Sequence, residues 1–154
     1  MNLVIDVDDP QADDVRAMLR RHLEFAHRNS PAEHLHALDV DRLLDPAVTF
    51  FSARFEGAVL GVGAIRHLDA SHGELKSMHT LESARGQGVG RAMVDHLLAL
   101  AADRGYRRVS LETGAGPAFA PAQALYARVG FRPCPPFGEY TVNPYSICMA
   151  KELA

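Results

Sequence analysis

Apolar residues recur at the helical spacing of three and four in two long segments of the 154-residue chain, 10–28 and 89–105. Two shorter segments show the same spacing. Residues 30–46 start at a Ser-Pro pair, which is typical of a helix N-terminus, and residues 117–130 end at a glycine, which is typical of a C-terminus. The pattern therefore predicts four helices.

β-Branched and aromatic residues are concentrated between these helices, as expected of strands. Seven strands are predicted, at residues 2–7, 47–57, 58–68, 73–81, 106–113, 131–133 and 145–153. The order βααβββαβαββ favours a single mixed α/β domain spanning residues 1–154, in which an antiparallel meander is followed by one βαβ crossover. A Glu-Gly-Ala sequence between the second and third strands suits a hairpin turn.

The composition narrows the class of protein. The chain is 47% hydrophobic and 23% charged, which suits one globular core, and no apolar run reaches the roughly 18 residues of a membrane span. Its acidic first residues are unlike a secretory signal. A net charge of −3 argues against general nucleic-acid binding, which needs a basic face. We therefore expect a cytoplasmic protein with no nucleic-acid or membrane partner.

Positive charge and glycine meet in one segment, ARGQGVGRAM, at residues 84–93. It joins a predicted strand to a predicted helix, and the first amides of a helix bind anions because they have no intrahelical partner. Glycines permit positive φ and leave no side chain between an anion and the backbone. The residues expected to hold a pyrophosphate are Arg85, Gly86, Gln87, Gly88, Val89, Gly90 and Arg91. Five arginines and two aspartates between residues 85 and 108 make this part of the chain locally basic.

Other functions of the loop fit less well. A nucleotide P-loop requires Gly-Lys-Ser or Gly-Lys-Thr, which is missing. A dinucleotide fingerprint requires GxGxxG, but Arg91 replaces the third glycine, although Glu112 would imitate the ribose-binding acid. That fingerprint also opens its domain, whereas about 80 residues precede this loop. A tight turn without a ligand stays open, but it needs only one glycine.

Two motifs in order make the chain recognisable. Arg85, Gly88 and Gly90 form RxxGxG, and residues 124–131, ALYARVGF, carry LYxxxGF about 40 residues later. The chain resembles the GNAT superfamily of N-acetyltransferases over nearly its whole length. Its closing segment resembles a subgroup of small bacterial members. The resemblance implies the acyl-CoA N-acyltransferase fold, a mixed and mostly antiparallel sheet flanked by helices. It also implies acetyl-CoA as cosubstrate, with its pyrophosphate on the RxxGxG loop and its body between two strands that splay apart.

The resemblance also implies how the pantetheine arm is bound. In the family, the end of the strand before the loop offers backbone groups to the pantetheine amides, and here that strand ends at Met78, His79 and Thr80. One departure concerns Ala120, which stands where the family often has an asparagine. A polar contact to the cofactor is therefore missing or supplied elsewhere.

Acetyl transfer requires the acceptor amine to lose a proton. For an alkyl amine of pKa about 10.4, forming the neutral nucleophile at pH 7 costs about 4.6 kcal/mol. Glu74 is the candidate base because it lies eleven residues before Arg85, where several family members carry a glutamate. The alternative is a solvated strand glutamate paired with Lys76.

The departing thiolate requires a proton donor, and Tyr126 of the second motif is the candidate. A phenol of pKa near 10 can protonate a thiolate whose conjugate acid has a pKa near 8.5. The alternative is a core residue, because Tyr126 shares an apolar helix face.

Cysteine and histidine suggest no other chemistry. Cys134 and Cys148 stand in no nucleophile or metal motif, so we expect reduced thiols and direct transfer without an acyl-enzyme. His34 and His36 lack further ligands at metal spacing, so we expect no metal site. Possible acceptor contacts form a wider set, namely His34, His67, His72, His79, Arg54, Glu139, Tyr140 and Asn143.

The sequence therefore predicts an enzyme that transfers the acetyl group of acetyl-CoA to an amine of a small molecule. Three alternatives stay open: a protein amino group as acceptor, a non-catalytic acyl-CoA sensor, and a protein that binds another nucleotide. The oligomeric state does not follow from the sequence. A homodimer is common in the family, and an edge strand near the C-terminus is where one would form.

Overall fold

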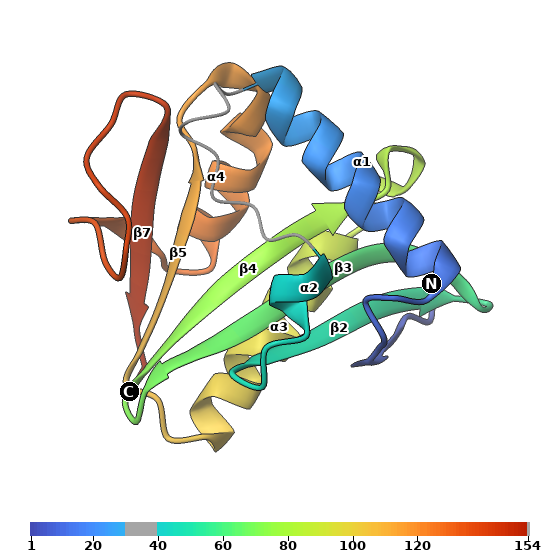
Figure 1. Cartoon of the computed structure of the whole chain (residues 1–154), viewed down its shortest axis with the longest axis horizontal. Coiled ribbons are helices and arrows are strands. Elements are labelled where there is room, and N and C mark those ends of the chain that lie inside the picture. Colours follow the sequence, from blue (N-terminus) through green and yellow to red (C-terminus); the bar gives the residue numbers. More distant parts are fainter. Residues whose placement is uncertain (30–39, 154) are drawn as a thin grey trace.

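The computed structural model describes residues 1–29 and 40–153, which form a seven-stranded sheet with helices on both faces (Figure 1). Its strands are β1 (Val4–Val7), β2 (Val48–Phe55), β3 (Ala58–Asp69), β4 (His72–Thr80), β5 (Arg108–Gly114), β6 (Arg132–Cys134) and β7 (Ser146–Glu152). Its helices are α1 (Asp13–Asn29), α2 (Val40–Leu43), α3 (Val89–Asp103) and α4 (Ala120–Arg128). The mixed sheet flanked by helices is the predicted fold.

The element boundaries differ from the prediction in small ways. Two 3₁₀ turns, Glu82–Ala84 and Pro117–Phe119, precede α3 and α4 and have no signal in the apolar pattern. Of the predicted helical segment 30–46, residues 30–39 lie outside the described residues and α2 occupies part of the rest. In the described part of the chain, no helix has the length and apolar character that crossing a membrane requires.

The sheet order is β1-β2-β3-β4-β5-β7-β6, and among these strands only β4 and β5 run parallel. Their pairing begins at His72–Arg108 and stops at Leu75–Leu111, although β4 continues to Thr80 and β5 to Gly114. Figure 1 shows the two strands diverging along this stretch. The divergence leaves backbone groups of β4 unpaired with β5 near the start of α3.

Two apolar cores lie on opposite faces of the sheet. The core beneath α3 includes Ile65, Leu75, Met93, Leu97 and Leu111. The core beneath α1 and α2 includes Val15, Leu19, Leu43, Phe50 and Val62. In Figure 1, α1 and α2 accordingly lie in front of the sheet and α3 behind it.

Strand alternation then decides where the polar residues of the central strands lie. Leu75 and Leu111 belong to the core beneath α3. Because successive residues of a strand face opposite sides, Glu74, Lys76 and Glu112 lie on the other face. Three ionisable side chains therefore gather on one face, next to the point where β4 and β5 separate.

The β2–β3 hairpin is confirmed, with Glu56 and Gly57 as its two loop residues. Their φ values are +50° and +84°, and two central residues of positive φ define a type I′ turn. This turn matches the twist of antiparallel strands.

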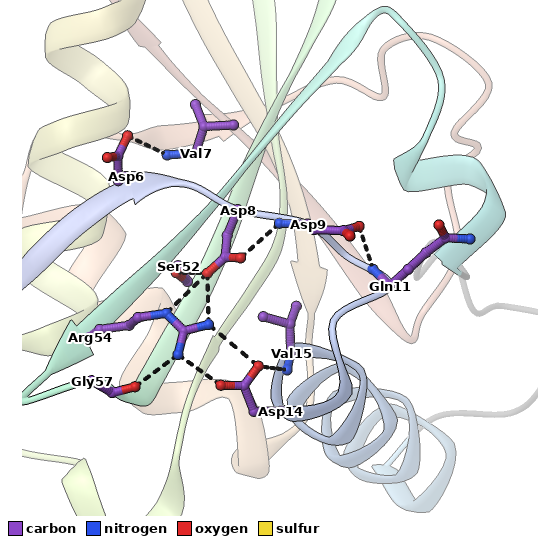
Figure 2. Close-up of polar contacts among 10 residues, drawn as sticks. All are labelled: Asp6, Val7, Asp8, Asp9, Gln11, Asp14, Val15, Ser52, Arg54 and Gly57. Carbon is purple, nitrogen blue, oxygen red and sulfur yellow. Dashed lines mark hydrogen bonds and ion pairs between the residues drawn. The ribbon is translucent and has the colours of Figure 1, made fainter.

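Arg54 of β2 fastens the start of α1 to the sheet (Figure 2). Its guanidinium lies 2.9 Å from the Asp8 carboxylate and 2.7 Å from that of Asp14, and it donates to the Gly57 carbonyl at 2.8 Å. The Ser52 hydroxyl also donates to Asp8. Arg54 lies outside the wall of the cavity described below, so the predicted acceptor contact finds no support.

Candidate active site

A cavity of about 480 Å³ opens where β4 and β5 diverge. Its wall is formed by α1, β4, β5, the loop before α3, α4 and residues of the 135–146 segment. The volume lies in the range of small-molecule sites. Of the ten predicted cofactor-binding residues, all except Gln87 line it. Gln87 instead donates its side-chain amide to the Ser83 carbonyl at 3.3 Å.

The glycine loop forms an open helix N-terminus at one end of this cavity. Gly86 and Gly88 have φ values of +77° and +86°, which other residues rarely adopt, and Gly88 is the N-cap of α3. The helix begins with a bond from the Ala92 amide to the Gly88 carbonyl at 3.0 Å, and no side chain caps it. The amides of residues 89–91 therefore have no intrahelical acceptor and suit an anion.

Gly90 serves a different purpose from the two glycines before it. It has no positive φ, but a β-carbon there would lie 3.3 Å from Leu125 and 3.5 Å from the Thr80 hydroxyl. It thus lets α3 approach α4 and the end of β4 closely.

The positive charge of the loop is more localised than the sequence suggests. Arg85 and Arg91 line the cavity, and Arg91 also lies 3.1 Å from Asp95 on the next helical turn. Arg104 instead donates to Thr49, and Arg108 pairs with Glu152 at 3.0 Å. Only two of the five arginines therefore contribute charge to the cavity wall.

A β-bulge shapes the β4 side of the cavity. Val62 pairs with His79 but Ala64 pairs with Lys76, so β4 has one extra residue opposite Gly63. Within it, Ser77 has a φ of +56°, and its buried hydroxyl has no hydrogen-bond partner among the described residues. A bulge reverses strand alternation. Nothing in the residue pattern of this strand indicates the bulge.

Beyond the bulge, Met78 lies on the α3 side of the sheet and His79 on the α1 side. A β-carbon on Gly63 would meet Met78 and Met93, whereas His79 contacts His22 of α1. Met78, His79 and Thr80 all line the cavity, on a stretch of β4 that is not paired with β5.

Glu74 is buried in a polar cluster with Lys76 and Tyr140. The Lys76 ammonium lies 3.0 Å from the Glu74 carboxylate, and the side chains are only 9% and 5% exposed. The Tyr140 hydroxyl donates to the same carboxylate oxygen at 2.5 Å and accepts from Lys76 at 2.7 Å. The predicted pairing with Lys76 is confirmed, but a solvated Glu74 is wrong because the 135–146 segment supplies Tyr140.

Within this cluster, access to the cavity is unequal. Lys76 and Tyr140 line the wall and Glu74 does not. Burial, together with the Glu74 charge and its hydrogen bond, holds the pKa of Tyr140 well above its usual range. Tyr140 is therefore protonated at neutral pH, and a proton moving from the cavity to Glu74 would be relayed by its hydroxyl.

Glu112 lines the cavity directly, from the part of β5 that has left β4. It hydrogen-bonds Ser146, and burial raises the pKa of its carboxyl. From the sequence, Glu112 is expected only as an imitation of a ribose-binding acid. Its position could have been predicted from strand register, because Glu112 follows Leu111 and therefore lies on the same face of the sheet as Lys76.

Tyr126 lies on α4 in the core beneath α3, only 6% exposed, with its ring edge-on to Phe131 at 5.8 Å. It also lines the cavity. Burial raises the pKa of its hydroxyl well above the usual value, so it stays protonated across the working pH range. Tyr126 is thus a core residue that also lies in the cavity wall, and its role as a proton donor stays a prediction.

Comparison with known proteins identifies the family. The profile of the acetyltransferase (GNAT) family matches residues 13–131. The chain belongs to the GNAT family of acetyltransferases. It is 40% identical to the uncharacterized N-acetyltransferase YsnE of Bacillus subtilis over 97% of this chain and 99% of that protein. It is 34% identical to an IAA acetyltransferase of Azospirillum brasilense over 99% of both chains.

Solved structures of the same fold support this membership. A candidate acyl-CoA N-acyltransferase from Klebsiella pneumoniae superposes with a TM-score of 0.83 at 27% identity, covering 99% of this chain and 98% of the other. A GNAT acetyltransferase from Elizabethkingia anophelis, solved with acetyl-CoA bound, superposes with a TM-score of 0.73 at 18% identity and 99% coverage of both. The latter shows that the fold is shared.

In this acetyltransferase, two histidines meet in the cavity wall. The Nδ1 atoms of His22 and His79 lie 3.3 Å apart, so one ring donates and the other accepts. Burial lowers the pKa of both imidazoles to about 4, and the pair is neutral at pH 7. Phe25 packs against His79, and Arg85 lies over the Phe25 ring, so the pair adjoins the glycine loop.

This pair is expected to make the acetyltransferase less stable as the pH falls from about 6.5 to 4. In that window His22 and His79 become protonated in the unfolded chain but stay neutral in the folded protein. Between pH 7 and 5 each imidazole therefore costs about 2 kcal/mol of unfolding free energy. His22→Asn should remove about half of this pair's contribution, measured by urea denaturation at both pH values. His27→Asn, exposed on the same helix, is the control. An equal pH dependence in all three proteins would contradict the expectation.

Two other histidines that were expected as acceptor contacts, His67 and His72, lie outside the cavity wall. His67 hydrogen-bonds Tyr106 at 2.6 Å and His72 bonds Ser110 at 2.7 Å, both outside the cavity wall, so neither lines the site as predicted. His34 and His36 lie outside the described residues. In the described ranges, no three metal-ligating side chains cluster.

Proposed function

We propose that this protein transfers the acetyl group of acetyl-CoA directly to an amine of a small-molecule acceptor. One observation carries the proposal: the uncapped N-terminus of α3, opened by Gly86 and Gly88, lies in the wall of a cavity between two diverging strands. The amides of residues 89–91, with Arg85 and Arg91, would bind the pyrophosphate. This assignment also agrees with the family, whose members use acyl-CoA.

The pantetheine arm would lie along β4. Past Leu75 this strand is not paired with β5, so backbone groups of Met78, His79 and Thr80 are available on that side. An arm bound there acts as an added strand, and its amides replace the missing neighbour. The identity of the three side chains should then matter less than their backbone.

Acetyl-CoA supplies an activated thioester, and the protein must move two protons. We propose that Glu74 receives the proton of the acceptor amine through Tyr140. Tyr140 passes its own proton to Glu74 along their hydrogen bond and takes up the amine proton in the same step. Tyr126 would donate its proton to the departing sulfur. Each transfer uses a group that lines the cavity or is bonded to one that does.

The cysteines support direct transfer over an acyl-enzyme. Burial raises the pKa of Cys148 to about 11 and raises that of Cys134 as well, so thiolate is scarce at neutral pH. Because the thiolate is the nucleophilic form, neither residue suits acyl transfer.

The cover over the cavity favours a small acceptor. Phe137 and Tyr140 pack against each other with ring centres 5.0 Å apart, and Phe137 also packs on His72. Because Tyr140, Tyr145 and Ser146 also line the cavity, this segment would restrict the approach of an acceptor carried on a large protein. The IAA acetyltransferase among the relatives makes IAA one compound to include in an acceptor screen.

Location and assembly stay predictions from the sequence and the resemblance: a cytoplasmic protein, with a homodimer as one option. The edge strand near the C-terminus is β6, which has three residues and contains Pro133. Proline lacks a backbone donor, so this edge is poorly suited to adding another strand.

Acetyl-CoA is expected to raise the melting temperature of this protein, and NAD and ATP are not. A ligand at 100 times its Kd stabilises by about 2.7 kcal/mol, which a thermal-shift assay resolves. Arg85→Ala should weaken the Kd of acetyl-CoA about tenfold by removing one charged phosphate contact. Arg104→Ala is the matched control, because Arg104 lies outside the cavity. Equal shifts with NAD, or an Arg85→Ala variant that binds as well as the control, would refute the assigned site.

A further inference from the structure

The two cysteines of the chain, Cys134 and Cys148, lie directly opposite each other on neighbouring strands. Both are free thiols, and the antiparallel pairing of β6 with β7 brings them into register. Opposed residues of antiparallel strands have Cα atoms about 4.5 or about 5.5 Å apart, depending on the hydrogen-bonding position. A disulfide joins Cα atoms that are about 4.4–6.8 Å apart. The two thiols can therefore form a disulfide without a shift of the backbone.

Both sulfur atoms lie on the same face of the sheet. Met149, next to Cys148 on β7, belongs to the core beneath α3, so Cys148 lies on the opposite face. Directly opposed residues share a face, so Cys134 lies there as well. Burial, and then the charge that Cys134 would carry as a thiolate, raises the pKa of Cys148 to about 11, as expected of neighbouring thiols.

Cys134 is the more accessible of the two thiols. It lines a second cavity, of about 340 Å³, whose wall also contains Arg108, Arg132 and Lys151. Burial raises the pKa of Cys134 and Arg108 lowers it in part, so its thiolate forms mainly above neutral pH. The thiolate is the form that oxidants attack. Cys148 is only 8% exposed, so it would react second.

Cys148 also holds a segment of the active site. Its sulfur accepts a hydrogen bond from the backbone amide of Phe137. The Phe137 ring packs on Tyr140 with 5.0 Å between ring centres, and Tyr140 donates to Glu74. In a disulfide the Cys148 sulfur would be directed toward β6 and would be a weaker acceptor. Oxidation would therefore loosen the segment that holds Tyr140 over Glu74.

We propose that Cys134 and Cys148 form an oxidation site, at which hydrogen peroxide converts the two thiols to an intramolecular disulfide that loosens the 135–146 segment. The Cys134 thiolate attacks one peroxide oxygen, the O–O bond breaks, and the departing hydroxide takes up a proton to become water. The Cys148 thiol then attacks the sulfur of the Cys134 sulfenic acid and displaces a second water. Two electrons thus pass from the thiols to one peroxide. The site goes beyond the proposed function, because acetyl transfer uses neither cysteine.

The test treats the reduced wild type with hydrogen peroxide at about pH 8 and then removes the excess. The intact mass should fall by two hydrogen atoms, a thiol count in urea should find neither thiol, and a peptide map should join Cys134 to Cys148. The Phe137 amide should exchange its hydrogen about 2- to 10-fold faster, as expected for the loss of one hydrogen bond. The kcat of acetyl-CoA consumption, with an acceptor from the screen above, should fall by a similar factor. Dithiothreitol should reverse these changes, whereas oxidised methionine requires a dedicated reductase.

Two variants separate the disulfide from other oxidation. Cys134→Ser forms no internal disulfide and should keep its Phe137 exchange rate and its kcat after peroxide. Cys148→Ala removes the hydrogen-bond acceptor, so it should resemble the oxidised wild type before peroxide is added and change no further. If Cys148→Ala does not fold, the wild type and Cys134→Ser still decide the question.

The internal disulfide, with a reversible change in exchange rate and kcat that is absent from Cys134→Ser, supports the proposal. Oxygen added to one cysteine without a cross-link, a disulfide between two chains, or an unchanged exchange rate or kcat in the cross-linked protein overturns it. A wild type that acetyl-CoA does not stabilise refutes the proposed function instead. Mass, thiol count and exchange rate then decide the oxidation site, because none of them needs a substrate.

Discussion

Replacing Tyr126 with Phe is expected to lower kcat about 100-fold and to leave the Kd of acetyl-CoA within about twofold. The substitution removes one hydroxyl from the cavity wall and keeps the ring that packs against Phe131. Without a donor, the sulfur must depart as a free thiolate, and general-acid catalysis typically contributes about 10²- to 10⁴-fold. The loss corresponds to about 2.7 kcal/mol of transition-state stabilisation.

A matched control separates this effect from simple loss of a buried hydroxyl. Tyr106 is also buried, at 4% exposed, but its hydroxyl bonds His67 away from the cavity. Tyr106→Phe should therefore cost stability and leave kcat unchanged. Steady-state thiol release gives kcat, and calorimetric titration gives the Kd. If Tyr126→Phe turned over as fast as the wild type, Tyr126 would be only the core residue that its helix face predicts.

The shape of the glycine loop follows from local sequence. Two glycines before an apolar helical stretch predict positive φ at a helix start, and Gly86 and Gly88 adopt it. The same pattern includes Gly90, but Gly90 has no positive φ, and its missing side chain instead lets α3 pack closely against Leu125. Local pattern identifies the loop but cannot distinguish a glycine needed for φ from one needed for space.

The burial of Glu74 could not be predicted from the sequence. A glutamate on an alternating strand is normally solvated, and Glu74 is buried because Tyr140, 66 residues later, lies over it. The same holds for Ser77, whose bulge is set by the pairing of β3 with β4. These features depend on contacts between distant segments, which periodicity does not report. The face of the sheet on which Glu112 lies, by contrast, follows from strand register, because β4 and β5 are parallel neighbours.

Removing Lys76 is expected to cost about 3–5 kcal/mol of unfolding free energy, because Lys76→Met leaves the Glu74 carboxylate buried without its cation. Glu74→Gln should be similarly destabilising, since it leaves the ammonium unmatched. The double variant should recover most of the loss, which a double-mutant cycle in urea at pH 7 would show as strong coupling. Removing the exposed Arg108–Glu152 pair, the control, should cost at most about 1 kcal/mol.

Activity of the same variants distinguishes a base from a purely structural ion pair. If Glu74 accepts the amine proton through Tyr140, Lys76→Met keeps the carboxylate and retains activity within about tenfold. Glu74→Gln then loses about 100-fold and moves the pH optimum upward, because the remaining reaction depends on amine that is already deprotonated. The pH dependence of kcat/KM is measured below the temperature at which either variant unfolds. Equal losses in the two variants, with an unchanged pH profile, would show that Glu74 only holds Lys76 and Tyr140 in place.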